Sequence, residues 1–224
     1  MIKALLFDID NTLIDFWKMK QKSCEAAVDS MIAAGLNIER NEALKDLFLL
    51  YDQYGIEYKE IFEKLIKQTK GQVDYRIVAH GIIAYRKLRE SQLIPYPGTI
   101  PTLIELKKKY KLAIVSDAPR LNAWFRLVAL NIDEFFNVVI TAADVRKQKI
   151  YAAPFKAALK KLGIKPDEAL MIGDRVKRDI ETAKKLGIKT CYARYGERNP
   201  LKNGESGADF EINNIKEILK LIPE

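Results

Sequence analysis

The chain has 224 residues, which is enough for one large domain or two smaller ones, and its 48% hydrophobic content is ample for a packed core. No apolar run approaches the roughly 18 residues of a membrane span, no signal-peptide pattern is present, and the two cysteines lie far apart, so we expect a cytoplasmic protein with no membrane partner. The formal net charge is +8, but lysines alternate with glutamates and no stripe of basic and aromatic residues is present, so we expect no nucleic-acid partner.

The first predicted element is a short buried strand, Ala4 to Phe7, which leads directly into two carboxylates. Asp8 and Asp10 are two positions apart, so on an extended backbone both side chains project to the same side. Carboxylates are costly to hold side by side at the end of a buried strand, and the arrangement therefore indicates chemistry. The alternative interpretation is an acidic loop after an edge strand.

Four helical patterns follow with no strand signal between them. They cover the ranges Phe16–Ala34, Asn41–Tyr54, Glu57–Lys70 and Asp74–Glu90. The turn-rich residues 95–98 then mark a boundary. We therefore predict a four-helix domain inserted at residues 15–93, within a second domain made of residues 1–14 and 94–224.

Strands and helices alternate in the rest of the chain. The predicted strands are Leu112–Val115, Asn137–Thr141, Ala169–Ile172, Lys189–Ala193 and Phe210–Ile212, and the predicted helices are Ile100–Tyr110, Arg120–Leu130, Pro154–Leu162, Val176–Leu186 and Asn214–Ile222. This alternation predicts an α/β fold with a doubly wound parallel sheet, in which ligands bind at the carboxyl ends of the strands. Residues 194–207 form a glycine-rich loop near that edge, with no role that the sequence assigns.

Several predicted strands end in polar residues. Ser116 closes the second strand, Asp174 follows the fourth, and Asp179 comes in the first turn or so of the next helix. Two carboxylates about 4 Å apart repel by about 4 kcal/mol at an effective dielectric of 20, so a cluster at this edge needs a divalent cation and a lysine. Oxygen ligands without histidine or cysteine favour Mg²⁺ over zinc.

These residues resemble the motifs of the haloacid dehalogenase superfamily, and most of the chain takes part. The motifs in chain order are Asp8-x-Asp10-x-Thr12, Ser116 at the end of a hydrophobic strand, a lysine, and Gly173-Asp174 followed by Asp179. The helical insertion resembles that of members with a helical cap over the active site. The resemblance implies a Rossmann-like catalytic core, with a cap at residues 15–93.

The resemblance implies a Mg²⁺-dependent phosphatase that acts through a covalent aspartyl-phosphate. Asp8 would be the nucleophile, and Asp10 would be the general acid for the leaving oxygen and then the base for water. Ser116 and Lys149 would hold the phosphoryl oxygens, and Thr12 would orient the first loop. The metal ligands would be Asp8, Asp10 through its backbone carbonyl, Asp174 and Asp179.

The implied substrate is a small phosphorylated metabolite, with glyceraldehyde 3-phosphate among the candidates, and the implied state is a monomer or homodimer. Asp10 favours phosphate-ester hydrolysis over a 2-haloacid dehalogenase, because an alkoxide leaving group needs a proton and a halide does not. A phosphosugar mutase of the same superfamily is a further alternative.

The third motif departs from the pattern of the superfamily, which is lysine-proline-x-proline before a phenylalanine. Counting back from Phe155 selects Lys149, but both prolines are missing and Lys147 is a rival. We therefore expect a less rigid lysine loop. Its consequence could be lower activity, or a catalytically weak phosphate-binding protein.

Overall fold

The computed structural model describes residues 1–198, 201 and 205–222. The chain forms two compact units. We call Met1–Phe16 together with Ile94–Glu224 the sheet unit, and Trp17–Leu93 the helical unit. The part of the predicted loop 194–207 that falls on residues 199–200 and 202–204 lies outside the described residues.

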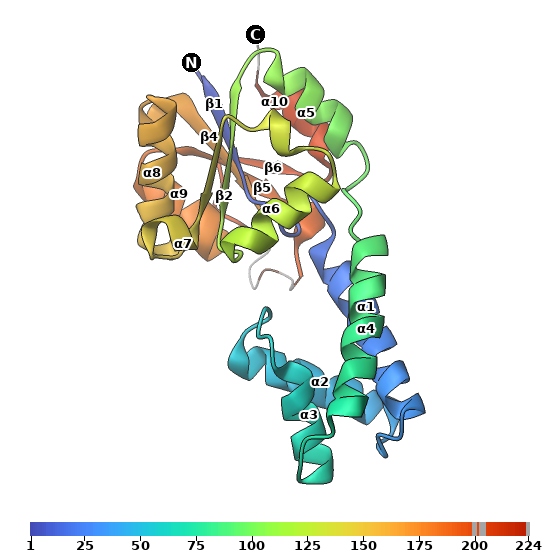
Figure 1. Ribbon diagram of the computed structural model, residues 1–224. Coiled ribbons are helices and arrows are strands. Elements are labelled where there is room, and N and C mark those ends of the chain that lie inside the picture. The colour runs from blue at the N-terminus through green and yellow to red at the C-terminus, as the bar shows by residue number, and fades with distance from the viewer. Residues whose placement is uncertain (199–200, 202–204, 223–224) are drawn as a thin grey trace. The chain divides into compact units, whose positions relative to one another are not determined.

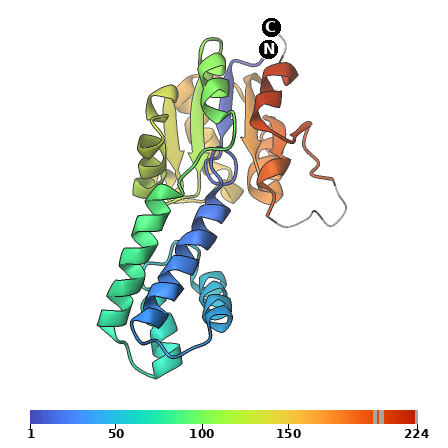
Figure 2. The same cartoon turned by 90° about the vertical axis from the view of Figure 1, so that its right-hand side faces the viewer.

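The sheet unit contains one six-stranded sheet in which every paired strand is parallel (Figures 1 and 2). Its strands are β1 (Ala4–Phe7), β2 (Lys111–Ser116), β3 (Val138–Thr141), β4 (Ala169–Gly173), β5 (Lys189–Ala193) and β6 (Phe210–Ile212). Their order in the sheet is β3-β2-β1-β4-β5-β6. The predicted α/β fold with a parallel sheet is therefore confirmed.

Strand β1 lies in the middle of the sheet because every one of its residues is apolar and fully buried. Phe7 is in register with Ile114 of β2 on one side and with Ile172 of β4 on the other. The three carboxyl ends are therefore level, and the residues that follow β1 lie between those that follow β2 and β4.

Helices cover both faces of the sheet (Figure 1). They are α5 (Thr99–Lys107), α6 (Arg120–Ala129), α7 (Ala142–Val145), α8 (Ala153–Leu162), α9 (Glu181–Lys185) and α10 (Ile218–Leu221). On one face, α8 and α9 bury Phe155, Leu159 and Ala183 against the side chains of β1 to β4. Helices α5, α6 and α10 lie on the opposite face, as both ribbon views show.

The helical unit is built from four helices around its own apolar core. They are α1 (Phe16–Ala33), whose first residue belongs to the sheet unit, α2 (Arg40–Tyr54), α3 (Ile61–Lys70) and α4 (Tyr75–Ser91). Helices α1 and α4 approach closely where Gly81 meets Met31, since a β-carbon at position 81 would lie 2.8 Å from the Met31 side chain.

The structure differs from the sequence prediction at several helix starts. The last helix, predicted from Asn214, begins at Ile218 after a 3₁₀ turn over Ile215–Glu217. The helix predicted from Glu57 begins only at Ile61, because Gly55 ends α2 with φ of 98° and a turn follows, closed by the Tyr58 amide on the Gly55 carbonyl. The helix predicted at 176–186 is a π-helical turn, Val176–Ile180, followed by the short α9.

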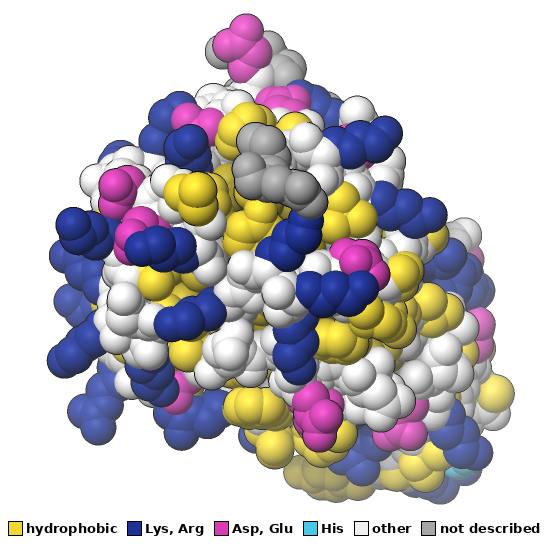
Figure 3. All heavy atoms as spheres, turned by 90° about the horizontal axis from the view of Figure 1, so that it is seen from above, with side chains coloured by type: hydrophobic (Ala, Val, Ile, Leu, Met, Phe, Trp, Pro, Cys, Tyr) yellow, Lys and Arg dark blue, Asp and Glu magenta, His cyan; other side chains and the backbone are white. Residues whose placement is uncertain are grey.

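Two features of the described residues concern the expected absence of nucleic-acid and membrane partners: the spread of surface charge and the character of the helices. On the face drawn in Figure 3, lysine and arginine side chains are spread out, with acidic and hydrophobic side chains between them. None of the helices in the described part of the chain is both long enough and apolar enough to cross a bilayer.

Candidate active site

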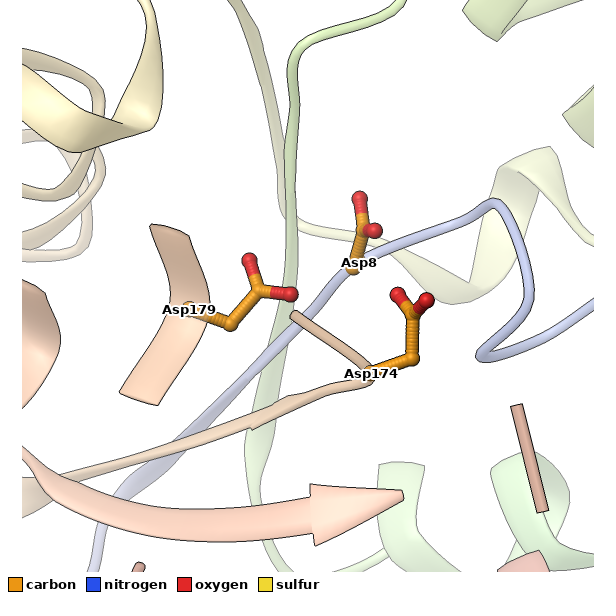
Figure 4. Close-up of side chains that lie close together, drawn as sticks. All are labelled: Asp8, Asp174 and Asp179. Carbon is orange, nitrogen blue, oxygen red and sulfur yellow. The ribbon is translucent and has the colours of Figure 1, made fainter. Parts of the chain in front are cut away.

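Three buried carboxylates meet at the carboxyl edge of the sheet (Figure 4). Asp8 follows β1, Asp174 follows β4, and Asp179 lies in the π-helical turn. One carboxylate oxygen of each lies within 4.8 Å of the others. The π-helical turn brings Asp179 there, because the amides of Asp179 and Ile180 both donate to the Arg175 carbonyl and the Arg175 amide donates to the Asp179 carboxylate.

Lys149 lies against this carboxylate cluster. Its Nζ is 2.9 Å from Asp8 Oδ1 and 2.5 Å from Asp179 Oδ1, and its side chain is only 2% exposed. Burial alone would lower the pKa of Lys149, but the carboxylates of Asp179 and Asp8 outweigh it and raise that pKa above its usual value. Lys147 is exposed and its Nζ lies over the Tyr151 ring instead.

Burial and mutual repulsion weaken the acids of the cluster. Burial raises the pKa of Asp174 well above its usual value, and the charges of Asp8 and Asp179 raise it further. Burial also raises the pKa of Asp179 to about 6, although Lys149 opposes the shift. Three carboxylates face the Lys149 ammonium group and the partly exposed guanidinium group of Arg175, so the fully ionised cluster keeps an excess of negative charge.

The donor set fits a magnesium ion. Both carboxylate oxygens of Asp174 are buried and accept no hydrogen bond from the described residues, and Arg175 Nε lies 3.4 Å from Oδ2. Buried polar groups without a hydrogen bond are unusual and need an explanation. A hard divalent cation among oxygen ligands would provide one, and it would also balance the excess negative charge of the cluster.

Two glycines make room for the cluster. A β-carbon on Gly173 would lie 2.4 Å from Asp179 Oδ2, so any larger residue there would push this carboxylate away. A β-carbon on Gly196 would lie 1.7 Å from the Asn11 carbonyl oxygen and 3.0 Å from the Asp174 side chain. Gly196 therefore allows residues 194–196 to pack directly on the loop that follows β1.

That loop is also held by Tyr195. The Tyr195 hydroxyl donates to the Thr12 carbonyl at 2.7 Å, and its ring packs edge-on against Tyr96 at 4.8 Å. The sequence assigned no role to residues 194–196, and their only signal was a glycine-rich segment near the correct edge of the sheet. Thr12 itself is fully buried within the loop.

The lysine loop is anchored by a residue that the sequence analysis did not select. The Lys149 amide donates to Asp117 Oδ1 at 2.8 Å, and Arg178 Nη1 lies 3.3 Å from Asp117 Oδ2. The chain then makes a 3₁₀ turn over Lys149–Tyr151 and reaches α8 through Ala152, whose φ is 62°. Asp117 thus ties this loop to the end of β2 although the motif's two prolines are absent.

Ser116 and Asp10, the other two residues predicted for catalysis, lie at the same edge of the sheet but have different contacts from the carboxylate cluster. Ser116 is buried at the end of β2, and its Oγ accepts from the Ala118 amide at 3.1 Å, which leaves the hydroxyl hydrogen available as a donor. Asp10 does not join the three-carboxylate cluster. Its Oδ2 lies 3.1 Å from Nη1 of Arg126 on α6 instead.

The parallel sheet, with a buried cluster of carboxylates and a lysine at its carboxyl edge, defines a Rossmann-like α/β protein with a candidate active site at the ends of its strands. The profile of the haloacid dehalogenase-like hydrolases matches residues 5–193. The glyceraldehyde 3-phosphate phosphatase of Methanocaldococcus jannaschii is 37% identical over 223 residues, which cover 99% of this chain and 97% of that protein. The chain therefore belongs to the haloacid dehalogenase-like hydrolase family.

Solved structures agree with this assignment. The crystal structure of a HAD phosphatase from Thermococcus onnurineus is 27% identical, with a TM-score of 0.69 over 98% of this chain and 97% of that one. That of YfnB from Bacillus subtilis, bound to magnesium, matches with a TM-score of 0.73 over 98% of each chain; at 19% identity it supports the fold alone. The predictions of the family and of a hydrolase are confirmed.

Proposed function

We propose that this hydrolase is a Mg²⁺-dependent phosphatase that cleaves a small phosphate monoester through an aspartyl-phosphate on Asp8. The observation that carries the proposal is the buried contact of Asp8 with Lys149, beside Asp174 and Asp179. A carboxylate needs this environment to act as a nucleophile, because a fixed cation must hold it and balance the charge of an incoming phosphate. The phosphatase names of relatives such as that of M. jannaschii support the proposal.

The magnesium ion would be held by the carboxylates of Asp8, Asp174 and Asp179, together with the backbone carbonyl of Asp10. The crowding of the three acids and the absence of hydrogen bonds to Asp174 from the described residues support this ligand set. When bound, Mg²⁺ would neutralise charge on the phosphoryl group and on the acids that surround it.

In the first step, a carboxylate oxygen of Asp8 attacks the phosphorus atom of the substrate, and the bond from phosphorus to the alcohol oxygen breaks. Asp10 donates a proton to that oxygen, so that an alcohol leaves rather than an alkoxide. Ser116 and Lys149 hold the phosphoryl oxygens by donating hydrogen bonds. Most of the rate enhancement then comes from positioning and charge stabilisation.

In the second step, water attacks the phosphorus atom of the aspartyl-phosphate. Asp10, now ionised, accepts a proton from this water, and the bond between phosphorus and the Asp8 oxygen breaks. Inorganic phosphate leaves, and Asp8 returns to the free carboxylate. The proton that Asp10 gave in the first step is thereby restored.

We further propose that the helical unit acts as the cap that selects the substrate, and that glyceraldehyde 3-phosphate or a similar metabolite is hydrolysed in the cytoplasm. The name of the M. jannaschii relative supports the substrate, and the two buried free cysteines, Cys24 and Cys191, suit a reducing compartment.

The test is release of inorganic phosphate from a panel of phosphate esters that includes glyceraldehyde 3-phosphate, phosphoglycolate and sugar phosphates. We expect release that requires Mg²⁺, stops with EDTA and is fastest for glyceraldehyde 3-phosphate. Isomerised sugar phosphates without free phosphate would instead indicate a mutase, and halide release from 2-haloacids a dehalogenase. Phosphate binding with no turnover on any ester would indicate a binding protein.

Replacing Asp117 tests how the lysine loop is held. In Asp117→Ala the Lys149 amide loses its acceptor, so Lys149 is less well fixed against Asp8, and we expect kcat/KM for p-nitrophenyl phosphate to fall about tenfold, as for loss of a hydrogen bond of about 1.4 kcal/mol. Asp117→Asn keeps an acceptor oxygen and should lose less. Wild-type kcat/KM in both variants would contradict the anchoring role.

A further inference from the structure

Arg126 is a buried arginine that the proposed reaction does not use. It lies on α6 with only 6% of its surface exposed, and its Nη1 is 3.1 Å from Asp10 Oδ2. Its Cζ lies 4.7 Å from the centre of the Phe16 ring. Burying a guanidinium group is costly unless partners compensate for its lost hydration, so this contact with Asp10 has an energetic weight that a surface ion pair lacks.

Asp10 lies in a loop, where the orientation of a side chain depends on the contacts that it makes. It lies beyond the end of β1, in a loop where the next residue, Asn11, has a φ of 58°, and its side chain is 23% exposed. Its carboxylate is not part of the Asp8–Asp174–Asp179 group. A group that transfers protons must lie within about 2.6–3.2 Å of the atom it serves, so its orientation decides the rate.

We propose that Arg126 is a positioning residue for Asp10, which orients the Asp10 carboxylate for proton transfer; this inference rests on the proposed phosphatase mechanism. The guanidinium group contacts Asp10 through Nη1, while its Cζ lies over the Phe16 ring. Lysine has a single point charge and no planar face, so it can replace only part of this contact.

The two steps of the reaction depend on Asp10 differently when the leaving group is p-nitrophenolate. This anion leaves without a proton, so phosphorylation of Asp8 proceeds without an acid. Hydrolysis of the aspartyl-phosphate still needs Asp10 as the base. A misplaced Asp10 therefore slows the second step and spares the first, and the phosphorylated enzyme accumulates.

The experiment is rapid-mixing kinetics of Arg126→Leu with p-nitrophenyl phosphate and Mg²⁺. We expect a fast burst of about one p-nitrophenolate per active site, and then a steady-state rate roughly 10²-fold below that of the wild type, as for loss of general base catalysis. Arg126→Lys should show the burst with an intermediate steady-state rate. Arg120→Leu removes the same charge from the same helix, at an exposed residue paired with Asp144, and should match the wild type.

The outcomes separate this inference from the proposed function. A wild-type steady-state rate in Arg126→Leu would overturn the positioning role. A burst amplitude and a steady-state rate that fall in proportion would also overturn it, because partial misfolding has that effect. If Arg126→Leu does not fold, a wild-type rate in Arg126→Lys would overturn it as well. Asp10→Asn serves as the reference variant. If it shows the burst and the Arg126 variants do not, only the positioning role of Arg126 fails. A wild-type protein without turnover would instead remove the proposed phosphatase function itself.

Discussion

Asp8→Asn is expected to abolish phosphate-ester hydrolysis, with kcat falling by a factor on the order of 10⁴ or more. The amide is not a nucleophile, and it cannot form the aspartyl-phosphate through which both steps pass. It also removes one of the two carboxylates that Lys149 contacts. The measurement is p-nitrophenyl phosphate hydrolysis with Mg²⁺ at saturating substrate, together with acid-quenched labelling of the protein by phosphate, which should be absent in the variant.

A matched control for Asp8→Asn is Asp167→Asn, which makes the same change at an exposed aspartate just before the amino end of β4. It should keep wild-type kcat and KM, because that end of the sheet is remote from the carboxylate cluster. Equal rates in Asp8→Asn and the wild type would remove Asp8 as the nucleophile. Labelling of Asp8→Asn with phosphate at wild-type yield would show that another residue carries the covalent bond.

The layout of the sheet could be predicted because its signals are local. β1 is a continuous apolar run followed at once by Asp8, and β4 is a similar run followed by Gly173 and Asp174. In a parallel sheet the carboxyl ends of strands meet at one edge, so the order of strands and helices along the chain already places these residues together. The distances between their carboxylates agree with that expectation.

The contacts that support the site could not be predicted, because each pairs residues far apart in the sequence without a local signature. Asp117 accepts from the Lys149 amide 32 residues further on, and Tyr195 donates to Thr12 across 183 residues. Arg126 lies in an amphipathic helix, where a single arginine normally indicates a solvated face. Only the packed fold shows that its guanidinium group is buried beside Asp10.

The π-helical turn illustrates a second limit. The sequence from Val176 has helical periodicity, and an α-helix beginning there is the natural prediction. The turn is instead widened by one residue, so that Asp179 reaches the cluster and Lys149. Such a local rearrangement depends on the long-range ion pair, which no periodicity of the segment itself reveals.

The metal-free protein is expected to become more stable when Asp174 is replaced by asparagine. At pH 7 the buried carboxylates repel one another, and removing one charge relieves a repulsion of a few kcal/mol. For a chain of this size each kcal/mol shifts the melting temperature by about 2–4 °C, so in EDTA we expect Asp174→Asn to melt about 3–8 °C above the wild type. Thermal unfolding followed by circular dichroism measures this shift.

Magnesium should reverse that order. Added at 100 times its dissociation constant, it should stabilise the wild type by about 2.7 kcal/mol and raise its melting temperature by about 5–10 °C. Asp174→Asn lacks the proposed ligand carboxylate, whose oxygens accept no hydrogen bond from the described residues in the wild type. Its melting temperature should therefore hardly respond to Mg²⁺. Its phosphatase activity should fall in parallel. An equal Mg²⁺ response in both proteins would contradict the metal site.

The pH dependence of the metal-free wild type follows from the same repulsion. Burial raises the pKa of Asp174, and that of Asp179 to about 6, whereas aspartates in the unfolded chain titrate near ~3.9. Above pH 4 and below these raised values the folded protein binds more protons than the unfolded chain, so its free energy of unfolding falls as the pH rises from about 4 through 6. Asp174→Asn removes one of the two titrating groups, and its melting temperature should fall less over this range. Asp167→Asn should follow the wild type, and an equally steep fall in Asp174→Asn would show that the repulsion does not arise at Asp174.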